Sequence, residues 1–258
     1  MSTPAYRITP ARVLRSEWHK LWTVRSTWIT LIASAVFLLG VGILMGATYT
    51  TDGGDSDVDT VVLSLYGSQL GGISLAVLGI LVTAGEYSTG MVRASMTAVP
   101  RRLPVLWAKA AIFTGAVLTV SFVTALVTFL TAQIFFHGTD QAASLTDDGI
   151  LAAIAGNAVG ATLLGVIALG LGAALRSVPG AIGAFIGGVM VLPEILGMLP
   201  YDAMDTAVRY FPTQAAGALG SADPMPGAAA PGAALFALCL WAAAALAVPA
   251  LSLKRRDV

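Results

Sequence analysis

Six windows of this sequence are long and apolar enough to cross a lipid bilayer, and they contain almost no charged residues. About 20 apolar residues are needed to span a hydrocarbon core of about 30 Å. The expected spans are residues 27–48, 61–84, 105–136, 150–175, 178–199 and 232–252. Only 11% of the chain is charged and 57% is hydrophobic, whereas soluble domains are about 25% charged. The sequence therefore predicts an all-α integral membrane protein with one six-helix transmembrane domain over residues 1–258.

The distribution of lysine and arginine predicts how the spans are oriented. All 14 of these residues except Arg209 fall on one side of the expected membrane, the side that the positive-inside rule assigns to the cytoplasm. They are Arg7, Arg12, Arg15, Lys20, Arg25, Arg93, Arg101, Arg102, Lys109, Arg176, Lys254, Arg255 and Arg256. The aspartates gather on the other side, from Asp52 to Asp59, at Asp140, Asp147 and Asp148, and from Asp202 to Asp223. We therefore expect a multi-pass protein with both termini in the cytoplasm.

Residues 10–25 form an amphipathic stretch before the first span. At 100° per residue, one side carries Ala11, Leu14, Trp18, Leu21 and Trp22, and the other carries Arg12, Arg15, Ser16, His19 and Thr23. A basic face beside a face bordered by tryptophan is typical of a helix lying at the membrane surface. Two interpretations remain open: a surface anchor, or an elbow helix that also contacts a cytoplasmic partner.

The polar segment 85–100, between the second and third spans, is too short to be a folded domain. We expect Glu86 to begin a short helix, where the helix dipole favours a carboxylate, with Arg93 on the same face and Pro100 ending it. The segment is either a charged turn that follows the positive-inside rule or a surface on which another protein presses.

The apolar external segment 200–231 predicts one or two short helices that dip into the outer leaflet, packed on the spans.

The sequence offers little that could carry out catalysis. It has no Gly-x-x-x-x-Gly-Lys-Ser/Thr phosphate loop, so we expect no ATP bound in that way and no cofactor in this chain. His19 and His137 are expected on opposite membrane faces, where they cannot share a metal. An intramembrane enzyme or an ion-coupled pump places ionisable groups within its spans, and here only Glu194 is a candidate.

A few polar side chains within the spans could line a pathway for an amphipathic or hydrophobic cargo. Ser64, Ser68 and Gln69 lie in the second span, and Asn157 lies in the fourth. Glu194 follows Pro193 near the outer headgroups. It is either a carboxylate at the membrane interface or part of an exit gate.

Three motifs together resemble the permeases of the type-2 ABC transporter family. The first is Leu14-Arg15-Ser16-Glu17-Trp18-x-Lys20-Leu21 with Val24-Arg25-Ser26-Thr27-Trp28, which is similar to the family's elbow helix. The second is Gly85-Glu86-Tyr87-x-x-Gly90-Met91-Val92-Arg93-x-Ser95 with Pro100-Arg101-Arg102 and Ala108-Lys109, which resembles its cytoplasmic segment after span two. The third, Tyr210-Phe211-Pro212-Thr213-Gln214-Ala215-Ala216, resembles its outer segment before the last span. With six spans and both ends inside, the likeness covers essentially the whole chain.

The resemblance implies the membrane subunit of a bacterial exporter in the plasma membrane, of the kind that exports antibiotics, peptides or lipids and can confer antibiotic resistance. Two such subunits, identical or not, would pair, and each would dock on a separate ATPase that binds ATP and Mg. The coupling helix would comprise Glu86, Tyr87, Ser88, Thr89, Gly90, Met91, Val92 and Arg93. The elbow helix would contribute Arg15, Glu17, Trp18, Lys20, Trp22 and Arg25. The cargo pathway would run past Ser64, Ser68, Gln69 and Glu194.

Two other interpretations follow from the same features. A permease-like scaffold or signalling subunit would dock an ATPase without moving cargo, so cargo would not stimulate ATP hydrolysis. An intramembrane enzyme would need no ATPase partner, but it lacks the buried ionisable residues that its chemistry requires. None of the three interpretations involves nucleic acid.

Overall fold

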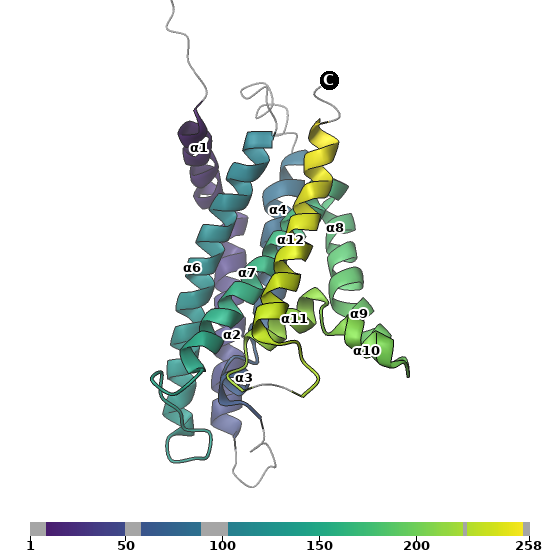
Figure 1. Ribbon diagram of the computed structural model, residues 1–258. Helices are drawn as coiled ribbons and strands as arrows, with labels where there is room; N and C mark the ends of the chain where they lie inside the picture. Colours follow the sequence, from purple (N-terminus) through teal and green to yellow (C-terminus); the bar gives the residue numbers. More distant parts are fainter. Residues whose placement is uncertain (1–8, 50–57, 89–102, 224–225, 255–258) are drawn as a thin grey trace, which may run out of the picture.

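The computed structural model describes residues 9–49, 58–88, 103–223 and 226–254, and every regular element within those ranges is helical (Figure 1). Within these described ranges, six helices are long and apolar enough to cross a membrane. They are α2 (Arg25–Thr48), α4 (Ser68–Ser88), α6 (Leu103–Phe136), α7 (Ile150–Leu175), the run from α8 through η2 to α9 (Val178–Gly197) and α12 (Pro231–Lys254). The all-helical, multi-pass class expected from the sequence is therefore confirmed.

Four shorter helices complete the described chain. α1 (Pro10–Thr23) precedes the first span and packs on α6, and α3 (Thr60–Ser64) precedes α4. α10 (Asp202–Val208) and α11 (Pro212–Leu219) lie between the fifth and sixth spans, and α11 packs on α7 and α12. Two short helices before span six agree with the sequence expectation for residues 200–231.

α7 is the central helix of the bundle. It packs against α4, α6, α11 and α12, and 61% of its most apolar window is buried, against 22% for the fifth span. Glycines bring α4 and α7 into backbone contact, because a Cβ on Gly79 would collide with the backbone oxygen of Gly165. Thr83 Oγ1 donates a hydrogen bond to the Leu169 carbonyl at 2.9 Å across the same seam. Small residues at such a seam let two membrane helices pack closely.

Span two differs from the expected helix at 61–84. The chain forms the short helix α3, turns at residues 65–67 and begins the long helix α4 only at Ser68. A crossing of about 30 Å takes about 20 residues at 1.5 Å each, so α4 continues to Ser88. The expectation that Glu86 begins a short helix is therefore wrong: Glu86 lies in the last turn of α4.

The fifth span is not a continuous α-helix. Its middle, η2 (Phe185–Val191), is a π-helix, and α9 (Leu192–Gly197) follows with Pro193 in its first turn. Proline has no N–H to donate to the preceding turn, and π segments are one way in which a membrane helix accommodates such a break. The π-helix thus divides this span into two arms.

The two ends of the bundle carry opposite charges. Figure 1 shows α1, the start of α6 and the end of α12 at one end, which we call the basic end because it carries Lys20, Lys109, Arg176 and Lys254. The other, acidic end is held together by Asp59. Its Oδ1 accepts the backbone N–H groups of Val61 and Val62 and caps α3. Its Oδ2 accepts from Ser221 Oγ at 3.1 Å and from the backbone N–H groups of Ala222 and Asp223 at 2.7 and 2.8 Å.

Candidate functional site

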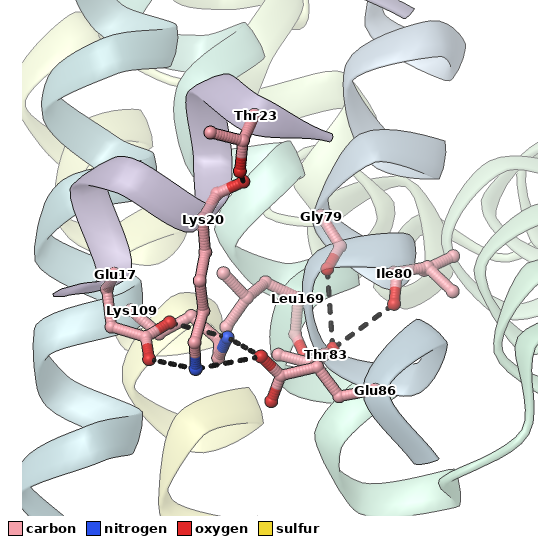
Figure 2. A network of polar contacts seen from close by, with 9 residues as sticks. All are labelled: Glu17, Lys20, Thr23, Gly79, Ile80, Thr83, Glu86, Lys109 and Leu169. Atoms are coloured by element: carbon pink, nitrogen blue, oxygen red, sulfur yellow. Dashed lines mark hydrogen bonds and ion pairs between the residues drawn. The ribbon is translucent and has the colours of Figure 1, made fainter. Parts of the chain in front are cut away.

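Four charged side chains from three helices meet at the basic end of the bundle. Glu17 and Lys20 come from α1, Glu86 from the last turn of α4, and Lys109 from the second turn of α6. We call these four residues the charged cluster. Figure 2 shows the ammonium groups of Lys20 and Lys109 lying between the carboxylates of Glu17 and Glu86. The cluster therefore ties α1 to two of the membrane helices.

The distances in the charged cluster are those of hydrogen-bonded ion pairs. Lys109 Nζ donates to Glu17 Oε2 at 2.7 Å and to Glu86 Oε1 at 2.9 Å. Lys20 Nζ donates to Glu17 Oε1 at 2.6 Å and to Glu86 Oε1 at 3.3 Å. The side chains of Glu17 and Lys109 are only 5% and 8% exposed, and those of Glu86 and Lys20 are 16% and 30% exposed. Charges buried to this extent need such partners, because water no longer solvates them.

The charged cluster shifts the titration of its two α1 members in opposite directions. Burial by itself would raise the pKa of the Glu17 carboxyl, but the charges and hydrogen bonds of Lys109 and then Lys20 outweigh burial, so the pKa is lowered. Burial would lower the pKa of Lys20, but the hydrogen bond and charge of Glu17, followed by those of Glu86, raise it overall. Both shifts favour the charged forms.

The buried stripe of α1 is not the apolar face expected from the sequence. Val13, Glu17 and Leu21 point into the bundle, whereas Leu14 and Trp18 are exposed on the surface. Of the other expected elbow residues, Arg15 and Arg25 are exposed and Trp22 is partly buried. The sequence analysis did not foresee the burial of Glu17, which becomes a core residue because a lysine from another helix neutralises it. The side of α1 that carries Leu14 and Trp18 faces away from the bundle.

The expected coupling residues are only partly within the described chain. Glu86, Tyr87 and Ser88 form the end of α4, and the Arg176 guanidinium lies 5.4 Å from the centre of the Tyr87 ring. Thr89, Gly90, Met91, Val92 and Arg93 lie outside the described residues. Glu86 was expected as a docking residue, and its described partners are lysines of the same chain.

Sequence reasoning missed the role of Lys109. It noted Lys109 as part of a motif but gave it no structural role, although α6 carries this lysine well within an apolar helix. An ionisable residue within a membrane helix is expected to pair with an opposite charge, so the signal was present. The partners could not be read off, because Glu17 lies 92 positions away in sequence.

A small cavity of about 80 Å³, with mixed polar and apolar walls, lies between α4, α7, η2 and α11. Ser68 and Gln69 line it as expected for a pathway, together with Asn157, Thr213 and the apolar side chains Phe185 and Met190. The volume suits a few water molecules, and it is well below the roughly 300 Å³ of the smallest typical ligand pockets. The cavity is therefore too small for a drug-sized cargo.

The other two expected pathway residues lie elsewhere. Ser64 is fully buried and donates to the Thr60 carbonyl at 2.7 Å. Glu194 is exposed at the acidic end and accepts a hydrogen bond from Gln214 at 2.8 Å. The structure therefore brings Ser68 and Gln69 together in one cavity, but not Ser64 and Glu194.

Within the described part of the chain, no group of three or more His, Cys, Asp or Glu side chains is placed to hold a metal ion. In comparisons with known proteins, the chain matches no family model and no curated protein sequence. The functional argument therefore depends on the sequence motifs and on the geometry given above.

Proposed function

We propose that this chain is the membrane-spanning permease subunit of an ATP-driven ABC exporter in a bacterial plasma membrane, with both termini in the cytoplasm. It pairs with a second permease subunit and docks on a separate ATPase, which binds ATP and Mg. The cargo is amphipathic or hydrophobic, such as an antibiotic, a peptide or a lipid-like molecule. The proposal rests on the resemblance of three motifs to the type-2 ABC permeases, and the charged cluster supports it.

The charged cluster is the observation that carries the proposal furthest. A subunit driven by an external ATPase needs a rigid link between its docking segment and its spans. Glu86 stands two residues from the end of α4 and three residues before the segment 89–93 that the resemblance assigns to docking. Through Lys20 and Lys109, it binds to α1 and α6 at once. A push on the end of α4 would therefore be transmitted to two further helices.

The small cavity beside Ser68 and Gln69 is compatible with the same proposal. A cavity of about 80 Å³ passes no drug-sized molecule, so cargo would pass here only after the surrounding helices move. The π-helix η2 itself lines this cavity through Phe185 and Met190. A break in a membrane helix beside a cavity is where such a helix bends.

The test is an affinity purification of the tagged chain in mild detergent with its bound proteins identified by mass spectrometry. We expect a near-stoichiometric protein that carries a phosphate loop. Recovery of the chain alone under several mild conditions would refute the proposal. In liposomes that hold the complex, cargo should stimulate ATP hydrolysis and cross the membrane. Hydrolysis that no cargo stimulates would favour the non-transporting scaffold.

Two matched substitutions separate docking by Glu86 from its role in the cluster. Glu86→Gln and Glu17→Gln each remove the charge of one carboxylate that pairs with Lys109. If Glu86 also docks, Glu86→Gln should lose the ATPase while Glu17→Gln keeps it, with both variants inserted in the membrane. Unchanged ATPase recovery and transport in Glu86→Gln would contradict the assignment of Glu86 to the coupling segment.

A further inference from the structure

A second and larger cavity lies directly beneath the charged cluster. It has a volume of about 350 Å³ and lies between the α1–α2 junction, the last two turns of α4 and the first third of α6. This volume is within the range of pockets that hold a drug-sized molecule or part of a lipid. No role assigned so far involves this space.

The cavity has one charged end and one apolar end. Glu17, Lys20, Glu86 and Lys109 form the charged end, and the apolar walls come from Leu21, Leu81, Val82, Ile112 and Phe113. Thr23, Val24 and Ser88 are exposed at its rim, so the cavity opens to the surface between the α1–α2 turn and the end of α4. A ligand that fits must therefore be an amphiphile with a polar head and an apolar body.

The cavity lies near the basic end of the bundle, on the side from which a lipid of that leaflet would reach it. Lys109 is six residues into α6, about 9 Å along the helix at 1.5 Å per residue. Amphipathic segments bury their apolar faces about 5–10 Å into the boundary between headgroups and acyl chains. Trp18 and Trp28 are exposed on either side of the α1–α2 turn, as is usual for aromatic residues at that boundary. Phe113 lies one turn deeper than Lys109.

The charges of the cavity favour a zwitterionic head. The four cluster residues carry two positive and two negative charges, so neither a lone anion nor a lone cation is complementary to the set. A head with a phosphate and an ammonium matches both signs, because the lysines donate to phosphate oxygens and the carboxylates accept from an ammonium. Lys109 has three N–H donors and two described acceptors, which leaves one donor for the phosphate.

We propose that this cavity binds one zwitterionic phospholipid, with its phosphate beside Lys20 and Lys109, its ammonium beside Glu17 and Glu86, and an acyl chain along Val82, Ile112 and Phe113. The bound lipid would fill the space between α1 and the spans that the charged cluster connects. This inference is independent of the proposed transport function, because it concerns binding to this chain alone.

Gly85 allows a test that leaves the four charges in place. It lines the cavity, and a Cβ built on it meets no heavy atom within 4 Å. Gly85→Ala and Gly85→Leu therefore fill the cavity to increasing degrees, and both raise helix propensity. Gly115 on α6 is the matched control: its Cβ also meets nothing within 4 Å, but it is exposed and does not line the cavity.

The experiment is native mass spectrometry of the delipidated chain titrated with phosphatidylethanolamine. Phosphatidylglycerol with the same acyl chains is the anionic comparison, and glycerophosphoethanolamine is the head without chains. We expect one phosphatidylethanolamine per chain, at least tenfold weaker binding of phosphatidylglycerol, and no binding of the head alone. Gly85→Leu should weaken phosphatidylethanolamine binding at least tenfold, Gly85→Ala less, and Gly115→Leu not at all. The same melting temperature in all variants shows that they are folded.

Three results would overturn the proposal: equal binding of the two lipids, binding of the head without its chains, or wild-type affinity in Gly85→Leu. The first would remove the zwitterion preference. The second would point to a soluble phosphate ligand, and the third would place the lipid elsewhere on the protein.

Discussion

Replacing Lys109 by methionine should destabilise the protein far more than replacing a surface lysine. The substitution keeps an apolar side chain of similar length but removes the ammonium that binds Glu17 at 2.7 Å and Glu86 at 2.9 Å. Removing one partner of a buried ion pair costs about 3–5 kcal/mol, because the other charge is left uncompensated. Since Lys20 still binds both carboxylates, we expect the lower end, about 3 kcal/mol.

Thermal melting of the detergent-purified chain measures this effect. For a chain of this size, 1 kcal/mol corresponds to about 2–4 °C in Tm, so Lys109→Met should melt about 6–12 °C below the wild type. Lys254→Met, at the exposed end of α12, is the matched control. It should stay within about 2 °C, because surface substitutions change stability by about 0.5 kcal/mol or less.

A double variant tests whether the loss comes from the ion pair or from packing. Lys109→Met with Glu17→Gln removes one charge of each sign and leaves the pair of Lys20 and Glu86. We expect the double variant to melt about 3–6 °C above Lys109→Met, a recovery of about 1.5 kcal/mol; the coupling energy is this recovery plus the loss measured for Glu17→Gln alone. If the two losses simply add, or if Lys109→Met melts with the wild type, the charged cluster does not stabilise the bundle and the reasoning above is refuted.

Three further predictions concern pH and packing. The lowered pKa of Glu17 contributes stability that is present above about pH 4.5 and is lost as pH falls through the lowered pKa. The raised pKa of Lys20 contributes stability that is present below about pH 10.5 and is lost as pH rises through the raised pKa. Tm should therefore be highest between these limits. Glu17→Gln should flatten the acid side of a Tm–pH profile and also weaken the alkaline side, because Glu17 is the main cause of the raised pKa of Lys20. Asp59→Ala should cost about 2 kcal/mol through the lost cap of α3 and the lost contacts to residues 221–223. Deuterium exchange should increase in α3 and in residues 221–223. Unchanged exchange would argue that Asp59 does not hold these two segments together. Gly79→Ala should cost about 1–3 kcal/mol because the added methyl group pushes α4 away from α7. Gly115→Ala, the control, should leave Tm unchanged or raise it. Equal melting temperatures of the two variants would contradict the close backbone contact between Gly79 and Gly165.

Much of the fold could be predicted from the sequence because the bilayer imposes a length on each helix. The fourth span illustrates this: the expected range 150–175 coincides with α7, since Gly149 and Arg176 flank an uninterrupted apolar run. The second span shows the limit of the argument. The window beginning at Thr60 contains no charged residue, so hydropathy alone does not reveal that α3 ends at Ser64 and that α4 begins at Ser68.

The candidate site was predicted less well, because its geometry depends on contacts between distant parts of the chain. The sequence assigned Glu17, Lys20 and Glu86 to two separate surfaces for a partner. It could not show that Lys109, 92 positions from Glu17, would join them inside the bundle. The period of α1 also gave no sign that Glu17 is buried, since charged residues normally face outward. The spacing of residues along one sequence does not show which charged residues far apart in the chain will pair.

The sequence positions within the charged cluster have a consequence for the order of biosynthesis. The chain is made from its N-terminus, so Glu17 exists before the lysine that will neutralise it, and 92 residues separate them. At 5–20 residues per second, that interval is on the order of 10 s. During it, Lys20 can serve Glu17 as a provisional counter-ion, because the two lie three residues apart on one helix. Lys109 has both of its partners as soon as it is made, since Glu17 and Glu86 precede it in the sequence. The charged cluster can therefore be completed only after the third span has been made.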